Sequence, residues 1–459
     1  MIIILLIVLI FILYFRILNY GYVVDDLTVF IEKKVPKPKE WWKILWLELK
    51  GDAYFNSKSA HALSLIIHTI TCVLIYFTFG RNNISFLAAV LFAINPVNTQ
   101  VSIWLSGKPY GVSAIFVLLM FWFPFLSPLF AWLTSYWSVN CILSPLMFLF
   151  TKFWYLSFLS IIIFCFKYKE IFRGEKIVSS TNKALISISP RKLIIFLKTY
   201  GYYFQQCLWP TRLGFYHKFL YTFGVDKEEN RKGYQLTYYF WIGLICVLMP
   251  LISTIWLGIG QYGVSWGLWW FSVNIVIFCN FITMNQGIGL RYCYLANIGL
   301  SLALANILIN YPLLAVVFIV YYTTRLWLMA PMYKADFWLT EYQIFEEPEF
   351  HYVWLLRGNN RFGNEQFKEA LSNYFEALRW RKNDFKTNFN IASCYIALGK
   401  TRQAREYLII AERCEHGDQE ESKADFINRA KEIIVKIELS KARGEMKISL
   451  PINEIPLTV

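Results

Sequence analysis

Charged residues are scarce in this sequence. Only 17% of its 459 residues are Asp, Glu, Lys or Arg, whereas 57% are hydrophobic and 19% are aromatic. A water-soluble protein of this length does not need so much apolar surface for its core. The shortage of charge therefore excludes an ordinary soluble protein and predicts that much of the chain faces lipid.

Cysteine and histidine motifs are missing as well. The nine cysteines are scattered, mostly within apolar stretches, and none forms a CxxC pair. Five histidines are present. His61 and His68 share one helical face, but two turns separate them by roughly 10 Å, too far to share one ion. We expect neither a disulfide framework nor a structural metal held by this pair.

The net charge of +14 is spread along the chain. Lys and Arg lie mostly in loops and in the C-terminal region, whereas a nucleic-acid-binding protein gathers them on one face. We therefore expect no nucleic-acid partner.

Long apolar runs predict a polytopic membrane protein. About eleven are long enough to cross a bilayer and carry Trp, Tyr, Lys or Pro at their ends. The first run, residues 1–19, lacks a basic leader and a cleavage site, which predicts an uncleaved signal anchor. The other spans are expected at 60–79, 84–104, 111–126, 128–149, 152–167, 192–210, 236–258, 263–284, 292–310 and 312–330.

Span parity predicts the topology. With a cytoplasmic N terminus, segments 20–58, 106–110, 211–235 and 285–291 fall on the non-cytoplasmic side, together with the C-terminal domain. That side is the periplasmic face of a bacterial inner membrane or the equivalent of the ER lumen. Counting positive charges does not decide the orientation, because segments 20–58 and 168–191 are both rich in Lys and Arg.

The polar C-terminal part repeats itself. Residues 350–440 have a period of 34, which pairs small residues with small and large apolar residues with large. The pairs are Ala370 with Ala404, Tyr374 with Leu408, and Ala377 with Ala411. This spacing is typical of tetratricopeptide helix pairs, whose surfaces bind protein partners or pack within assemblies.

The sequence thus predicts an all-α protein, a membrane helical bundle followed by a short tetratricopeptide-repeat α-solenoid. The expected parts are a transmembrane domain at 1–332, a linker at 333–349, two repeats with a capping helix at 350–440, and a tail at 441–459.

Polar residues mark three places in the membrane domain. Asp25 and Asp26 follow the first span, amides interrupt the span at 84–104 with Lys108 at its outer end, and Arg291 opens a late span. Taken singly, each has an ordinary explanation: solvated acids, hydrogen bonds between helices, or anchoring at the interface. Together, Lys108 and Arg291 at one level could cradle a lipid phosphate.

The order of these groups resembles the transmembrane and tetratricopeptide-repeat O-mannosyltransferases of the C-type glycosyltransferase superfamily. In that family the first outer loop carries an acidic pair, matched here by Asp25 and Asp26. The second span carries two histidines, matched by His61 and His68. The third span carries His-Pro-x-His-x-Glu followed by Ser-Gly-Arg, of which Pro96 and the Ser-Gly pair are kept.

The sequence also departs from the family's pattern. Asn95, Asn98, Gln100 and Lys108 stand where the family has two histidines, a glutamate and an arginine. Leu290 stands where a glutamate usually precedes the late Arg-Tyr pair. The acid pair and both cationic positions are thus kept, while two carboxylates and two imidazoles are lost.

The resemblance implies transfer of a mannose-like sugar from a polyprenyl phosphate to a protein or glycan acceptor, with inversion. A phosphate leaves as a stable anion, so a single base is sufficient. One of Asp25 and Asp26 would take the acceptor proton, and the other would contact the acceptor or a divalent metal ion. Lys108 and Arg291 would hold the donor phosphate. The supporting residues would be His61, His68, Asn98, Gln100 and Tyr292.

Two other classes of function stay open. A noncatalytic membrane assembly factor would keep the fold and recruit partners through its repeats, and the amides at Asn95, Asn98 and Gln100 favour it. A transporter or flippase is less compatible, because the spans lack the acids and paired broken helices expected of a coupled pump.

Overall fold

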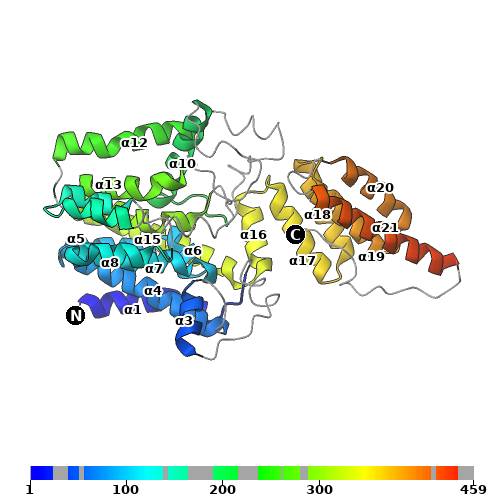
Figure 1. The fold of residues 1–459 in the computed structure, drawn as a ribbon, viewed down its shortest axis with the longest axis horizontal. Helices are drawn as coiled ribbons and strands as arrows, with labels where there is room; N and C mark the ends of the chain where they lie inside the picture. The colour runs from blue at the N-terminus through cyan, green and yellow to red at the C-terminus, as the bar shows by residue number, and fades with distance from the viewer. Residues whose placement is uncertain are drawn as a thin grey trace. The chain divides into compact units, whose positions relative to one another are not determined.

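The chain is built from helices, as its computed structural model shows (Figure 1). The structure describes residues 2–23, 40–50, 56–137, 143–163, 190–215, 236–258, 260, 262–279, 288–414 and 420–442. Within these ranges every regular element is a helix and none is a strand, which confirms the all-α prediction. The chain passes from a first unit to a second between Ala335 and Asp336.

Five helices of the described part are long and apolar enough to cross a membrane, with mean hydropathy of 1.3 to 2.8. These helices identify a membrane protein. They are α1 (Ile2–Tyr14) with η1 (Phe15–Asn19), α4 (Ser57–Thr78), η4 (Leu105–Gly107) with α7 (Lys108–Trp122), α12 (Tyr238–Leu257), and α15 (Pro312–Met329) with η11 (Ala330–Lys334). A sixth candidate is bent by 57° and consists of α5 (Asn83–Ile94), η3 (Pro96–Asn98) and α6 (Thr99–Ser102).

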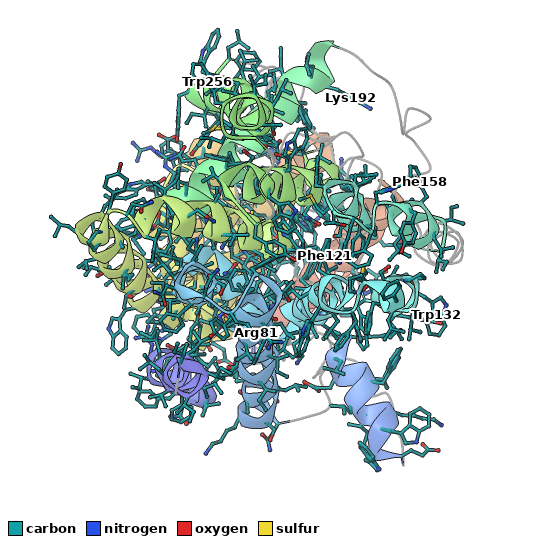
Figure 2. The ribbon with its side chains drawn as sticks, turned by 90° about the vertical axis from the view of Figure 1, so that its left-hand side faces the viewer. Arg81, Phe121, Trp132, Phe158, Lys192 and Trp256 are labelled. Carbon is teal, nitrogen blue, oxygen red and sulfur yellow. The ribbon has the colours of Figure 1, made fainter. Side chains whose placement is uncertain are left out.

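The spans differ in how much of their surface the protein itself covers. Only 22%, 17% and 28% of the residues are buried in the spans of α1, α12 and α15, against 56% in α4 and 61% in the η4–α7 span. Trp256 of α12 lies at the rim and Phe121 of α7 lies inside the first unit (Figure 2). Because their exposed side chains are apolar, α1, α12 and α15 face lipid.

Glycines allow neighbouring helices of the first unit to pack closely. α14 (Cys293–Leu308) is almost entirely buried, and it packs on α13 (Val264–Ile275). A Cβ atom added to Gly299 would lie 2.4 Å from the carbonyl oxygen of Gly267. On α10 (Pro190–Leu208), the carbonyl of Leu197 would lie 1.8 Å from a Cβ on Gly243 of α12. Backbone contact of this kind is how membrane helices associate without a hydrophobic driving force.

The total of about eleven spans stays a prediction. The stretch expected as one span at 128–149 is two separate elements, α8 (Ser127–Thr134) and η7 (Ser144–Phe150). Pro128 and Pro145 stand in their first turns. Proline starts a helix readily but cannot continue one, because it has no N–H to donate.

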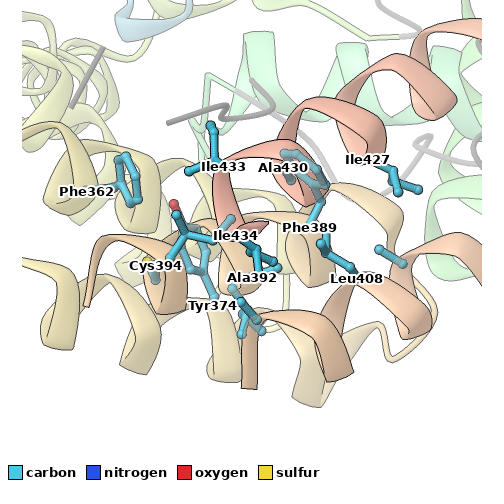
Figure 3. Close-up of a cluster of buried hydrophobic side chains, with 14 of the residues drawn as sticks. Phe362, Tyr374, Phe389, Ala392, Cys394, Leu408, Ile427, Ala430, Ile433 and Ile434 are labelled. Carbon is cyan, nitrogen blue, oxygen red and sulfur yellow. The ribbon is translucent and has the colours of Figure 1, made fainter. Parts of the chain in front are cut away.

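The described residues of the second unit form a series of six helices. They are α16 (Asp336–Glu346), α17 (His351–Gly363), α18 (Phe367–Trp380), α19 (Phe385–Ala397), α20 (Thr401–Arg413) and α21 (Glu420–Ala442). α19 begins 34 residues after α17, and α20 begins 34 residues after α18. Tyr374 and Leu408, which the period pairs, are both buried in one hydrophobic cluster with Ile434 of α21 (Figure 3).

The linker expected at 333–349 contains α16, so it is not a plain connection. Leu339 and Gln343 of α16 are buried. Glu341 forms an ion pair with Arg357 of α17, with 2.7 Å between Oε1 and Nη2. The helical pattern of this segment is short, and the sequence prediction therefore included it in the linker.

Candidate functional site

The candidate site begins at a break in a membrane helix. α5 ends at Ile94, and Asn95 is extended before η3 and α6 resume at an angle of 57°. The Asn95 side chain accepts a hydrogen bond from the Val97 N–H at 3.1 Å, and Pro96 has no N–H that needs a partner. The break is therefore encoded locally by the Asn-Pro pair.

The break releases carbonyl groups at the end of α5, and buried side chains satisfy them. Asn98 Nδ2 donates to the Phe92 carbonyl at 2.7 Å. The Ala93 carbonyl accepts from Tyr14 OH at 2.9 Å and pairs with His68 Nε2 at 3.3 Å. Without these donors, buried carbonyls in apolar surroundings would be costly. Asn98 and His68 thus stabilise the break.

The hydrogen-bond partners of His68 assign its tautomer. A carbonyl only accepts, so Nε2 carries the proton and Nδ1 accepts from Tyr294 OH at 2.8 Å. The ring is fully buried and lies against Phe92 and Tyr14. Both nitrogens of His68 are therefore engaged within the core of the first unit.

Three amides join the break to neighbouring helices. Asn95 Nδ2 donates to the Cys207 carbonyl of α10 at 2.8 Å and to Asn297 Oδ1 of α14 at 3.4 Å. Asn297 Nδ2 donates in turn to Asn98 Oδ1 at 3.3 Å. Buried amides in this arrangement satisfy one another and fix the positions of three helices.

Arg291 lies beside the C-terminal end of α6. It belongs to η10 (Leu290–Tyr292) and is only 7% exposed. Its backbone N–H donates to Gln100 Oε1 at 3.0 Å. Its guanidinium group donates to Tyr110 OH at 3.4 Å and to Tyr292 OH at 3.3 Å.

Aromatic rings surround the Arg291 guanidinium. Its central carbon lies 5.3 Å, 5.9 Å and 4.8 Å from the ring centres of Trp104, Tyr110 and Tyr292. Phe278 stacks on Tyr292 with 4.3 Å between ring centres, which holds that ring in place. The rings attract the cation and restrict its access to water. We call Arg291, Gln100, Trp104, Tyr110 and Tyr292 the arginine cage.

Lys108 is neutralised by an acid that the sequence analysis did not single out. Its Nζ lies 2.6 Å from Glu48 Oε1, and both side chains are fully buried. Glu48 lies near the end of α3 (Trp41–Leu49), whose Trp46 packs against Tyr136 and Trp137. A buried charge requires such a partner, because desolvation of either group alone is expensive.

His61 lies in the first turns of α4, beside the segment that leaves α1. Its Nε2 is 3.2 Å from the Gly21 carbonyl, and its ring meets the edge of Tyr20. Ser57 donates to the Tyr20 carbonyl. Gly21 N–H also donates to the carbonyl of Lys334 at 3.0 Å, which ties the end of η1 to the end of η11.

These contacts collect distant segments at one end of the first unit. The C-terminal ends of η1, α6, α10 and η11 lie there with the N-terminal ends of α4, α7 and α14. That segments 20–58, 106–110 and 285–291 share one side of the membrane stays a prediction. Which side of the membrane it is stays a prediction.

The structure brings together only some of the predicted site residues. Arg291, Tyr292 and Gln100 meet in the arginine cage, whereas Asn98 and His68 belong to the helix break. Lys108 lies on α7, two positions before Tyr110 of the arginine cage, but it pairs with Glu48. Asp25 and Asp26 lie outside the described residues. Among those that are described, no three His, Cys, Asp or Glu side chains gather as a metal site would need.

No known family model, curated protein or solved structure matches the chain.

Residues that the sequence analysis missed are Glu48, Trp104, Tyr110 and Asn297. Glu48 had a weak signal, since it is an acid in an apolar, tryptophan-rich segment. Trp104 and Tyr110 were indistinguishable from the many interfacial aromatics of a chain with 19% aromatic residues. Their roles depend on contacts with Arg291, which lies more than 180 positions away from both.

Proposed function

We propose that this protein transfers a sugar from a polyprenyl phosphate to a protein or glycan acceptor at the membrane surface. The observation that carries the proposal is the arginine cage, which holds a desolvated cation at one end of the membrane unit. The segment that leaves α1 lies at the same end. Asp25 and Asp26 follow that segment in the sequence. The proposal also rests on the resemblance to the O-mannosyltransferases described above.

The proposed reaction is a single displacement. The acceptor hydroxyl oxygen attacks the anomeric carbon while the bond from that carbon to the phosphate oxygen breaks. One of Asp25 and Asp26 takes the hydroxyl proton, and the phosphate leaves as an anion beside Arg291. An ordinary aspartate, with a pKa of about 3.9, is a weak base, so proton transfer accompanies formation of the new bond. The configuration at the anomeric carbon is inverted.

Lys108 enters this proposal with a changed role. Its amino group is buried against Glu48 at 2.6 Å, so a phosphate that binds Lys108 has to displace that carboxylate. The guanidinium group of Arg291 donates to the hydroxyl groups of Tyr110 and Tyr292 and lies against aromatic rings. We assign the main phosphate contact to Arg291, because these rings hold a desolvated cation in a fixed position.

The finer architecture belongs to the same proposal. We infer about eleven spans with a cytoplasmic N terminus. The second unit is proposed to be a non-cytoplasmic tetratricopeptide-repeat domain that recruits protein partners. Helix pairs repeating every 34 residues support the repeat assignment.

The test is transfer by the full-length protein in liposomes. Radiolabelled polyprenyl-phosphate mannose is the donor, and solubilised membrane protein is the acceptor mixture. Arg291→Met, Asp25→Asn and Asp26→Asn are each compared with Trp266→Phe, a change remote from the cage. Loss of Arg291 should lower turnover about a hundredfold or more. Unchanged turnover in Arg291→Met, or in a variant lacking both aspartates, would refute the assignment.

A noncatalytic assembly factor is the second candidate. It is favoured by Asn95 and Asn98, which stand where the family that the chain resembles carries imidazoles and which are joined through hydrogen bonds to Asn297. A wild-type protein without turnover, whose copurifying partners are lost when exposed residues of the second unit are changed, would favour this candidate.

A further inference from the structure

Two buried donors in the arginine cage have no acceptor among the described residues. They are Nε2 of Gln100 and Nε1 of Trp104. Gln100 is fully buried and Trp104 is 3% exposed. Leaving a buried donor without a partner is unfavourable by an amount comparable to a lost hydrogen bond. Two such donors beside one buried cation indicate a ligand that supplies acceptors.

The chemistry of the cage selects the kind of ligand. An amide NH2 group, an indole N–H and a guanidinium group can only donate hydrogen bonds. Gln100 has a single acceptor, Oε1, and this atom already accepts the backbone N–H of Arg291. The group that fits such a set offers several acceptor oxygens and negative charge, as a phosphoryl group does. Sugar hydroxyls, which also donate, fit it less well.

We propose that Gln100 Nε2 and Trp104 Nε1 bind the phosphoryl oxygens of a lipid-linked phosphate, beside the guanidinium of Arg291. That the phosphate is lipid-linked rests on the proposed function. The inference adds two binding residues, and it makes the phosphate site independent of Lys108, whose charge Glu48 already balances.

Two substitutions remove the donors and keep the other contacts that each side chain makes with Arg291. Trp104→Phe keeps an aromatic ring toward Arg291 and loses the indole N–H together with part of the ring. Gln100→Glu keeps an acceptor for the Arg291 backbone N–H and replaces the donors with negative charge. The second change therefore opposes phosphate binding without removing the contact that holds η10.

The chain offers a matched control for each variant. Trp266 also has a buried, unpartnered indole N–H, but it packs against Phe79 and Tyr262, away from Arg291. Gln206 also has an unpartnered Nε2, while its Oε1 accepts backbone N–H groups from Thr211 and Arg212. Trp266→Phe and Gln206→Glu make the same chemical changes outside the cage.

The experiment measures binding of radiolabelled polyprenyl monophosphate to the full-length protein in nanodiscs. Inorganic phosphate and phosphatidic acid serve as competitors. We expect Trp104→Phe to weaken binding about tenfold and Gln100→Glu about a hundredfold. Both controls should stay within about twofold of wild type. Polyprenyl-phosphate affinities of Trp104→Phe and Gln100→Glu equal to those of their controls would overturn the inference.

The competitors identify the source of the phosphate. Competition by inorganic phosphate at the same concentration as the lipid would overturn the lipid-linked assignment. Weaker competition by both competitors than by unlabelled polyprenyl phosphate supports it. Wild-type turnover with unaffected binding in both variants refutes this inference alone. Cage-dependent binding without any turnover refutes the transferase proposal alone.

Discussion

Glu48 and Lys108 show how the chain keeps charge inside an apolar unit. Their oxygen and nitrogen atoms are 2.6 Å apart and both side chains are fully buried. The attraction of such a pair offsets most of its desolvation cost, but neither partner is tolerated alone. The pair holds the end of α3 against the first turn of α7.

This pair leads to a stability prediction. Glu48→Gln or Lys108→Met alone should destabilise the protein by about 3–5 kcal/mol, because each breaks an ion pair whose side chains are both fully buried. The double variant should recover most of that loss. Thermal unfolding in detergent measures all four proteins as a double-mutant cycle. A double variant less stable than both single variants would contradict the prediction.

Cys394 gives a pH prediction for the second unit. Burial raises the pKa of its thiol above the ordinary value of 9.0. The folded state then holds the neutral thiol while the unfolded state ionises, so stability is complete below about pH 8 and falls above about pH 9. Each further pH unit costs about 1.4 kcal/mol.

Alkylation of Cys394 in the full-length protein tests this. Its protection relative to an unfolded peptide of the same sequence should be constant below about pH 8. It should then fall about tenfold per pH unit above about pH 9, read by mass spectrometry of the α19 peptide. Protection that is unchanged up to pH 10 would show that the thiol ionises equally in both states.

At the scale of elements, close helix contacts depend on single glycines. The α13–α14 contact leaves no room for a Cβ on Gly299, which would lie 2.4 Å from the Gly267 carbonyl. Gly299→Ala should therefore separate the two helices and destabilise the first unit by about 1–3 kcal/mol or more. Gly260, where a Cβ meets nothing within 4 Å, is the matched control.

The measurement is thermal stability in detergent for Gly299→Ala and Gly260→Ala. The first should melt well below wild type, and the second should be close to it. Equal melting temperatures for the two variants would mean that α13 and α14 are not in backbone contact. Since α14 carries the amide of Asn297 and follows Arg291, the loss should extend to phosphate binding.

The elements also show how far sequence reasoning reached. Hydropathy located the spans near α1, α4, α7, α12 and α15, and the 34-residue period located α17 to α20. Hydropathy predicted one span at 84–104, although Asn95 and Pro96 break the helix there. A hydropathy average over a window does not register a local helix cap. It also merged α8 and η7 for the same reason.

At the scale of the whole membrane unit, the ends of the helices define its two surfaces. α4 has 22 residues and spans about 33 Å at 1.5 Å per residue, so the turn after it lies far from the arginine cage. Lys50 and Lys334 lie near the cage end, as the Glu48–Lys108 and Gly21–Lys334 contacts show. Asn83 begins α5 at the opposite end.

Single cysteines at these positions test the arrangement. Lys50→Cys and Lys334→Cys should react with a membrane-impermeant maleimide from the same side of sealed vesicles. Asn83→Cys should react only from the other side. All three positions are exposed in the structure, so reagent access is not limiting. Labelling of Lys50→Cys and Lys334→Cys from opposite sides would contradict the fold of the first unit.

The sequence by itself determined that the chain is helical, that it belongs in a membrane and that its C-terminal part repeats. These features follow from the composition and spacing of residues that are close together in the sequence. Only the tertiary structure decided that Glu48 balances Lys108 and that Gln100 and Trp104 surround Arg291. Those contacts join residues 60 and 191 positions apart, and hydropathy reports the preferred surroundings of a side chain without identifying its partner.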